Sequence, residues 1–162
     1  MSYPVAQVQL IDAKNYKDLN ACVFLSADQN LSASNVVNKV DFDGVHHDDL
    51  GMFDAVNHEF TITIPGVYRM RINARNGEPG GSVSRCKQFI YLNGSQIAEG
   101  SIFGLDASVA FNNGPTCEVT RKLQVSDVVD GRALSNYTSG GLISGDAQGT
   151  ISTMEIELIT PT

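Results

Sequence analysis

Tryptophan is absent from this 162-residue sequence, cysteine occurs three times, and only 18% of the residues are charged. Three cysteines, Cys22, Cys86 and Cys117, are too few and too far apart for a disulfide framework, and an odd count leaves at least one thiol unpaired. We expect them to be reduced and buried, because cysteine is among the most buried side chains. No apolar run approaches the roughly 18 residues of a membrane-spanning helix, so no membrane partner is expected.

Positive charge is also scarce. The formal net charge is −7 and the eleven basic residues are scattered, whereas attraction to nucleic acid or to an anionic membrane needs clustered lysine and arginine. We expect no nucleic-acid partner. The first residues contain no basic segment followed by an apolar core, so we expect synthesis in a cytoplasm without a secretory signal.

The residues that are abundant favour an all-β domain. Hydrophobic residues make up 42% of the chain, and 15 glycines punctuate sequence rich in serine, asparagine and threonine, as many short strands joined by tight turns require. A chain of this length buries about 68–70% of its unfolded surface, enough for one domain with a core of its own.

Residues 59–74 contain two runs of alternating apolar and polar residues that meet at a Pro-Gly turn. This period of two predicts two half-buried strands. The apolar faces are formed by Phe60, Ile62 and Ile64 in the first run and by Tyr68, Met70 and Ile72 in the second.

The stretch Phe-Thr-Ile-Thr-Ile-Pro-Gly-Val-Tyr-Arg-Met, residues 60–70, resembles the signature of the C1q/tumour-necrosis-factor-like jelly-roll head, and the preceding Phe-Asp pair fits the same pattern. The resemblance implies an antiparallel jelly-roll β-sandwich that assembles as a homotrimer. It covers roughly residues 22–160, so we divide the chain into an N-terminal arm, 1–21, and a jelly-roll domain, 22–162. The signature residues of the core are Phe53, Phe60, Ile62, Pro65, Gly66, Tyr68 and Met70.

Three departures from the family pattern stand out. Asn57-His58 replaces a Thr-Gly pair, Ser126 replaces a glycine, and the final strand, 151–159, lacks the usual Phe and Gly while keeping its alternation. Elsewhere, Asn93-Gly94 predicts a hairpin between a strand at 86–92 and the following segment. We predict loops at 76–82 and 135–149, and a strand extension at 103–111.

The sequence contains one cluster of metal-ligating residue types and no catalytic motif. The cluster has no zinc-motif spacing, so we interpret it as a solvated acidic loop, with a calcium site as the alternative. No Ser, Cys or Thr stands in a nucleophile motif, so we predict neither an enzyme nor a cofactor. Four arginines, Arg69, Arg71, Arg75 and Arg85, are interpreted as charges on the outer faces of strands. The cluster comprises Asp41, Asp43, His46, His47, Asp48, Asp49 and His58.

Apolar residues on both faces of 89–92 exceed what one sandwich interior uses, which favours a subunit interface. The stand-alone head with an arm is similar to C1q-like proteins of tailed bacteriophages. We therefore expect a virion protein, a trimeric capsid decoration (cement) protein on the outer capsid surface, made in the host cytoplasm and bound to the major capsid protein. The alternative is a receptor- or glycan-binding tip of a tail fibre, which would normally need a shaft before the head.

The arm carries its own apolar alternation, Ala6, Val8 and Leu10. Strands with unpaired backbone groups add to exposed sheet edges, so we expect this arm to pair with a neighbouring subunit or with the capsid shell. The alternative is a frayed terminus.

Overall fold

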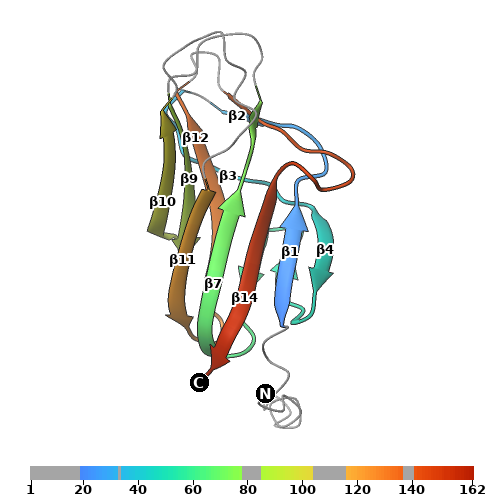
Figure 1. Cartoon of the computed structure of the whole chain (residues 1–162), viewed down its shortest axis with the longest axis vertical. Helices are drawn as coiled ribbons and strands as arrows, with labels where there is room; N and C mark the ends of the chain where they lie inside the picture. Colours follow the sequence, from blue (N-terminus) through green and yellow to red (C-terminus); the bar gives the residue numbers. More distant parts are fainter. Residues whose placement is uncertain (1–18, 33, 78–84, 104–115, 137–140) are drawn as a thin grey trace.

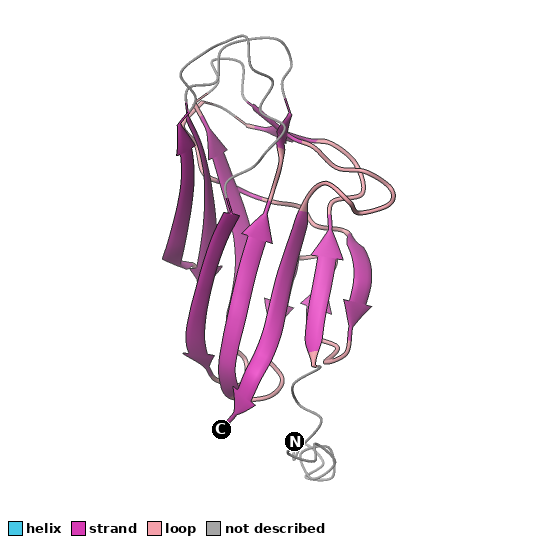
Figure 2. Cartoon of the chain, in the orientation of Figure 1, coloured by secondary structure: helices cyan, strands magenta, loops and turns pink. Residues whose placement is uncertain are grey.

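The computed structural model of the protein describes residues 19–32, 34–77, 85–103, 116–136 and 141–162. Within these ranges every regular element is a β-strand (Figure 2). The strands are β1 (Asn20–Phe24), β2 (Gln29–Leu31), β3 (Asn38–Lys39), β4 (Gly44–Asp48), β5 (Phe53–Asp54), β6 (Glu59–Thr61), β7 (Gly66–Asn73), β8 (Asn76–Gly77), β9 (Arg85–Leu92), β10 (Ser95–Phe103), β11 (Thr116–Leu123), β12 (Val128–Ser135), β13 (Gly141–Ile143) and β14 (Thr153–Pro161).

Two antiparallel sheets face each other and form a sandwich (Figure 1). The five-stranded sheet has the order β11-β7-β14-β1-β4, and the six-stranded sheet has the order β10-β9-β12-β6-β5, with β3 also paired to β12. A small sheet, β2-β13-β8, lies at the upper end in Figure 1, and β1 begins and β14 ends at the lower end. The predicted all-β jelly-roll sandwich is confirmed.

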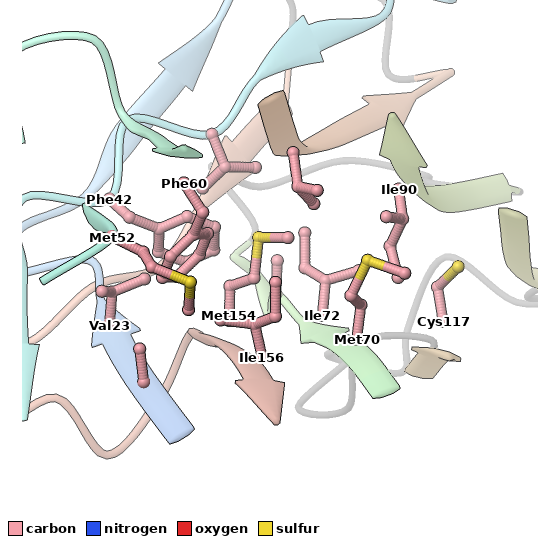
Figure 3. Close-up of a cluster of buried hydrophobic side chains, with 14 of the residues drawn as sticks. Val23, Phe42, Met52, Phe60, Met70, Ile72, Ile90, Cys117, Met154 and Ile156 are labelled. Carbon is pink, nitrogen blue, oxygen red and sulfur yellow. The ribbon is translucent and has the colours of Figure 1, made fainter. Parts of the chain in front are cut away.

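The core lies between the two sheets and follows from the alternation of their longest strands. In β7, Tyr68, Met70 and Ile72 are fully buried, while the residues between them are exposed. Strand β14 repeats the pattern beside β7, and β9 and β12 supply apolar residues from the opposite sheet (Figure 3). The predicted inward face of the final strand, Met154, Ile156 and Leu158, is confirmed.

The two sheets approach each other closely at Gly131 in β12. A Cβ placed there would lie 2.7 Å from Ile72 Cδ1, 2.9 Å from Met154 Sδ and 3.2 Å from Phe42 Cε2. Carbon atoms do not come that close without displacing a neighbour, so a larger residue would push β12 away from β7 and β14.

The Pro-Gly turn carries the chain from one sheet to the other. Strand β6 pairs with β12, whereas β7 lies between β11 and β14, so these consecutive strands are not a hairpin. Glycine is needed at Gly66 because a Cβ would lie 2.5 Å from Leu158 Cδ1 and 2.6 Å from Thr160 O. Just beyond the turn, the Tyr68 hydroxyl donates to Ile64 O at 2.7 Å, and burial raises the pKa of Tyr68 to about 12.

Positive backbone φ angles explain two departures from the family pattern. Ser126 has φ 72° and His58 has φ 54°, a conformation that favours glycine, so both side chains occupy positions where glycine would be unstrained. His58 offsets part of its strain, since its Nδ1 donates to Phe42 O at 2.7 Å. Asn93 and Gly94 also have positive φ and join β9 to β10, which confirms the predicted hairpin.

The loop predictions were partly wrong. Residues 44–48 form strand β4 inside the region interpreted as an acidic loop, and β13 lies inside the predicted loop 135–149. Asn76 is buried in β8, at the start of another predicted loop. These strands are short and pair with distant segments, so backbone pairing determines them and no side-chain alternation reveals them. The predicted extension beyond Phe103 and the arm residues Ala6, Val8 and Leu10 lie outside the described residues.

Replacing the tyrosine of the signature tests the core. We expect Tyr68→Ala to lower the free energy of unfolding by about 3–5 kcal/mol, the usual loss for a large buried aromatic side chain. Tyr68→Phe keeps the ring and removes only the hydrogen bond to Ile64 O, so it should cost about 0.5–1.5 kcal/mol. Chemical denaturation measures both, and equal losses for the two variants would contradict the described packing.

A substitution at Ser126 tests the strained turn. We expect Ser126→Gly to raise the free energy of unfolding by about 0.5–1 kcal/mol, because the relief of left-handed strain exceeds the entropy that glycine adds to the unfolded chain. Ser126→Ala keeps the strain and serves as the matched control, with little change. A destabilising Ser126→Gly would show that the φ angle is not strained.

Candidate assembly surfaces

The histidines of the predicted acidic cluster serve the structure of β4 and its neighbours. The His46 ring packs on Phe24 with 4.6 Å between ring centroids, and its Nε2 lies 3.0 Å from Gly149 O. His47 Nε2 donates to Asn20 Oδ1 on the adjacent strand β1. No group of three or more metal-ligating side chains comes together in the part of the chain that the structure describes.

The aspartates of the same region act mainly on nearby backbone. Asp43 accepts hydrogen bonds from the backbone N–H and the hydroxyl of Ser26, at 2.8 and 2.6 Å. Asp54 accepts from the backbone N–H groups of Val56 and Asn57 and closes the β5–β6 turn. The Asn57 amide, followed by these two N–H groups, holds the pKa of Asp54 below its usual value. Asp43 and Asp54 therefore stabilise local backbone structure.

All three cysteines are buried and free, as predicted. Cys22 lies on the outer side of β1, opposite Glu155 of β14. Burial, together with the negative charge of Glu155, raises the pKa of Cys22 to about 11. Burial also raises the pKa of Cys117. Thiols that stay protonated are poor nucleophiles.

The outer face of the five-stranded sheet is lined by ion pairs between neighbouring strands. Arg71 of β7 contacts Glu118 of β11 at 3.2 Å and Glu155 of β14 at 3.8 Å, and Arg69 pairs with Glu157 at 2.5 Å. These arginines therefore lie on an outer face and are neutralised within the chain, as their interpretation as strand charges predicted. Arg75 lies beyond the end of β7, and the side chain of Arg85 is outside the described residues.

The outer face of the six-stranded sheet carries an aromatic platform, which we define as Phe89, Tyr91, Asp130 and Arg132. Cross-strand pairing places Phe89 between Glu99 of β10 and Arg132 of β12. The Arg132 guanidinium lies 3.9 Å from the Tyr91 ring centroid, and Phe89 meets Tyr91 edge-on. Phe89 is only 3% exposed, so its side chain offers little apolar surface, whereas Tyr91 is half-buried. The predicted subunit interface at this face stays a prediction.

Arg132 is fixed in this platform by a two-pronged contact. Its Nε and Nη2 donate to the two carboxylate oxygens of Asp130, at 2.6 and 3.0 Å, and Asp130 is 4% exposed. The hydrogen bond to Asp130 raises the pKa of Arg132, which is charged throughout the physiological range. The sequence analysis missed this pair. Its signal was the i, i+2 spacing of opposite charges in an alternating strand, which places both on one face.

Apolar side chains remain exposed at edges and turns. Val125 follows the end of β11, Ile159 lies near the end of β14, and Val45 lies on the edge strand β4, each more than one third exposed. Val56, in the β5–β6 turn, is 85% exposed. The central regions of both outer faces carry charged or covered side chains, so unpartnered apolar surface lies at the margins of the sandwich.

Comparison with known proteins identifies the fold. No protein-family model and no curated protein matches the sequence. Among solved structures, the globular domain of zebrafish complement 1qA protein matches with a TM-score of 0.63 and 15% identity, over 90% of this chain and 100% of that one. Murine APRIL gives 0.58 at 10% identity, over 86% and 99%, and Eiger TNF from S. frugiperda gives 0.59 at 8%, over 87% and 92%. The chain has the C1q/TNF-like jelly-roll fold.

Within this C1q/TNF-like fold the signature residues lie around the Pro-Gly crossover. Phe60, Ile62, Tyr68 and Met70 are buried, and Phe53 is half-buried with its ring centroid 5.2 Å from that of Phe60. They form the core and bring no reactive groups together. No helix in the described ranges is long and apolar enough to cross a membrane.

The two outer faces predict different responses to loss of a carboxylate. Asp130→Ala should lower the free energy of unfolding by about 1.5–3 kcal/mol, because it removes two charge-assisted hydrogen bonds from a buried carboxylate. Glu157→Ala, which breaks the exposed pair with Arg69, should change it by less than about 0.5 kcal/mol. Urea denaturation measures both values. A Glu157→Ala loss as large as that of Asp130→Ala would refute the distinction between the two faces.

Proposed function

We propose that the chain is a homotrimeric structural head that decorates the outer surface of a viral capsid and binds its major capsid protein. C1q/TNF-like domains typically trimerise, which supports the homotrimer. The similarity of a head with an N-terminal arm to C1q-like proteins of tailed bacteriophages supports the location. The trimer and the capsid location are both inferred from the fold. Further support comes from the hydrogen bonds and ion pairs that the polar side chains make within the chain.

The observation that carries the proposal is that the reactive side chains already have structural roles. His46, His47 and His58 hydrogen-bond to neighbouring segments, and the three cysteines are buried. The outer-face charges of Arg69, Arg71 and Arg132 are paired within the chain. Catalysis needs a nucleophile, a base or a metal in mutual reach, and nothing among the described residues offers that arrangement. A role in assembly uses what remains, which is apolar surface at the margins.

We assign the contact with the shell to the lower end of the sandwich in Figure 1. Strands β11 and β14 both end there, and β1 begins there, with the N–H of Leu158 donating to Leu19 O at 3.0 Å. The exposed Val125 and Ile159 follow or lie near these strand ends. Apolar side chains that are exposed at the end of the sandwich where β1 begins are suited to contact a protein surface.

The proposal predicts a trimer that binds shells. Light scattering on the purified protein at micromolar concentration should give three times the chain mass of 17.4 kDa. Mixed with undecorated shells and sedimented, the protein should pellet in many copies per shell. Introducing charge by Val125→Glu together with Ile159→Glu should weaken pelleting about tenfold or more.

The matched control is Val56→Glu, which places the same charge on an exposed valine away from the lower end and should pellet normally. A stable monomer would contradict the trimer. A trimer that fails to bind shells, but is found in a few copies at the ends of tail fibres, would instead support the fibre-tip function.

A further inference from the structure

The two edges of the five-stranded sheet differ. At one edge, β11 closes against β10 of the other sheet, where a Cβ added to Gly100 would lie 2.5 Å from Thr116 O. At the other edge, β4 pairs with β1 on one side and with no described strand on its outer side. Figure 1 shows β4 at the open margin of the sheet. Its outward backbone groups are therefore a template for another strand.

The side chain of Val45 indicates what such a strand would cover. Val45 stands opposite Val23 in the β1–β4 pairing, so it lies on the core side of the sheet. Val23 is fully buried, but Val45 is 47% exposed, and no strand among the described residues continues the sheet beyond it. Edge strands are commonly protected by lysine, proline or a β-bulge, and β4, Gly-Val-His-His-Asp, has neither lysine nor proline. Its one irregularity is a register shift at His46 in the pairing with β1. A strand with apolar residues on its core side would extend the core over Val45.

We propose that residues 6–10 of a second copy of this chain add as a strand to the outer edge of β4. Ala6, Val8 and Leu10 alternate over five positions, which matches the five residues of β4. On one face of an added strand they would cover Val45 with apolar side chains, while Gln7 and Gln9 would face outward. The assignment rests on the proposed homotrimer, and it selects the neighbouring subunit over the shell as the partner of the arm.

The position of the arm root favours another copy over the arm's own head. The described chain begins at Leu19, beside the lower end of β1, and the turn after β4 lies next to it, with Asp49 N–H donating to Asn20 O and Gly51 N–H to Asp48 O. An arm returning to its own β4 would have to pass around this turn. The eight residues 11–18 span on the order of 27 Å when extended, so the arm is long enough to extend beyond its own head. In a closed ring each subunit gives one arm and receives one.

Disulfide trapping tests the pairing and its direction. We co-express two differently tagged chains, one with Val8→Cys and the other with Val45→Cys. Both chains also carry Cys22→Ser, which removes a native thiol of the neighbouring strand β1. The purified assembly is then oxidised. We expect a two-chain band on a non-reducing gel. Gln9→Cys, used in place of Val8→Cys, would face outward and should give much less of the two-chain band. Val56→Cys, used in place of Val45→Cys, tests whether exposure of the cysteine alone is enough for cross-linking.

Each other result overturns the assignment. Absence of a cross-link from Val8→Cys, and equally from Ala6→Cys and Leu10→Cys, would show that the arm does not lie on β4. A chain carrying both Val8→Cys and Val45→Cys that forms only an intrachain disulfide would show that the arm folds onto its own head.

A second measurement links the pairing to assembly. Val45→Lys places a charge on the core side of the edge, and deletion of residues 2–18 removes the added strand, so each should raise the trimer dissociation constant about tenfold or more. Their combination should be no worse than either alone, since both remove one interaction. Val45→Thr keeps the β-branched shape and serves as the control. Additive effects, or no effect, would contradict strand addition.

The outcome is separable from that of the proposed function. Sedimentation with shells is run on the wild-type protein and on the cross-linked assembly. If the cross-linked protein does not bind shells, the decoration role is contradicted and the strand exchange is still supported. Shell binding without any cross-link would do the reverse.

Discussion

The contact between the two sheets at Gly131 is the constraint on which the rest of the molecule depends. Strand β12 can lie across β7 and β14 only because this position has no side chain to meet Ile72 and Met154. That approach sets the spacing of the sandwich and allows Tyr68, Met70 and Ile72 to be fully buried. Because interiors are packed to crystal-like density, a displacement here would spread through both sheets.

How far the fold was predictable depended on the length of each strand. Strands β7 and β14 were predicted because eight or nine residues display a period of two that few alternatives produce. Strands β4, β8 and β13 have two to five residues and no clear alternation, and they exist because distant segments pair with them. Pairing with distant segments also decides which sheet a strand joins. The sequence therefore did not show that β6 and β7, which are neighbours in sequence, belong to opposite sheets.

Local strain was hidden for a different reason. A glycine in the sequence indicates a possible left-handed backbone conformation. Ser126 and His58 also have positive φ, but their residue types do not indicate it. The motif comparison located both positions as departures, and only the backbone angles explained them. Likewise, Phe89 and Tyr91 were identified as a second apolar face, but the stacking of the Arg132 guanidinium on the Tyr91 ring required the structure.

These features together place recognition at the margins of the sandwich. The outer face of one sheet carries ion pairs, and that of the other carries the aromatic platform. The centres of both sheets therefore have few unpaired charged or apolar side chains with which to bind a partner. The open edge of β4 and the apolar side chains near the lower end are among the exposed apolar surfaces that remain, together with Val36, Val37 and Val56. An assembly that uses edges and ends fits a head that forms a ring and sits on a larger shell.

The proposed capsid role is tested most directly by electron cryo-microscopy of the virus particle that the proposal implies. Three-fold density that fits three copies of the sandwich, with lower ends on the capsid surface and a strand added to each β4, is the predicted result. Density for the sandwich only at the tips of tail fibres, or its absence from the particle, would contradict the account.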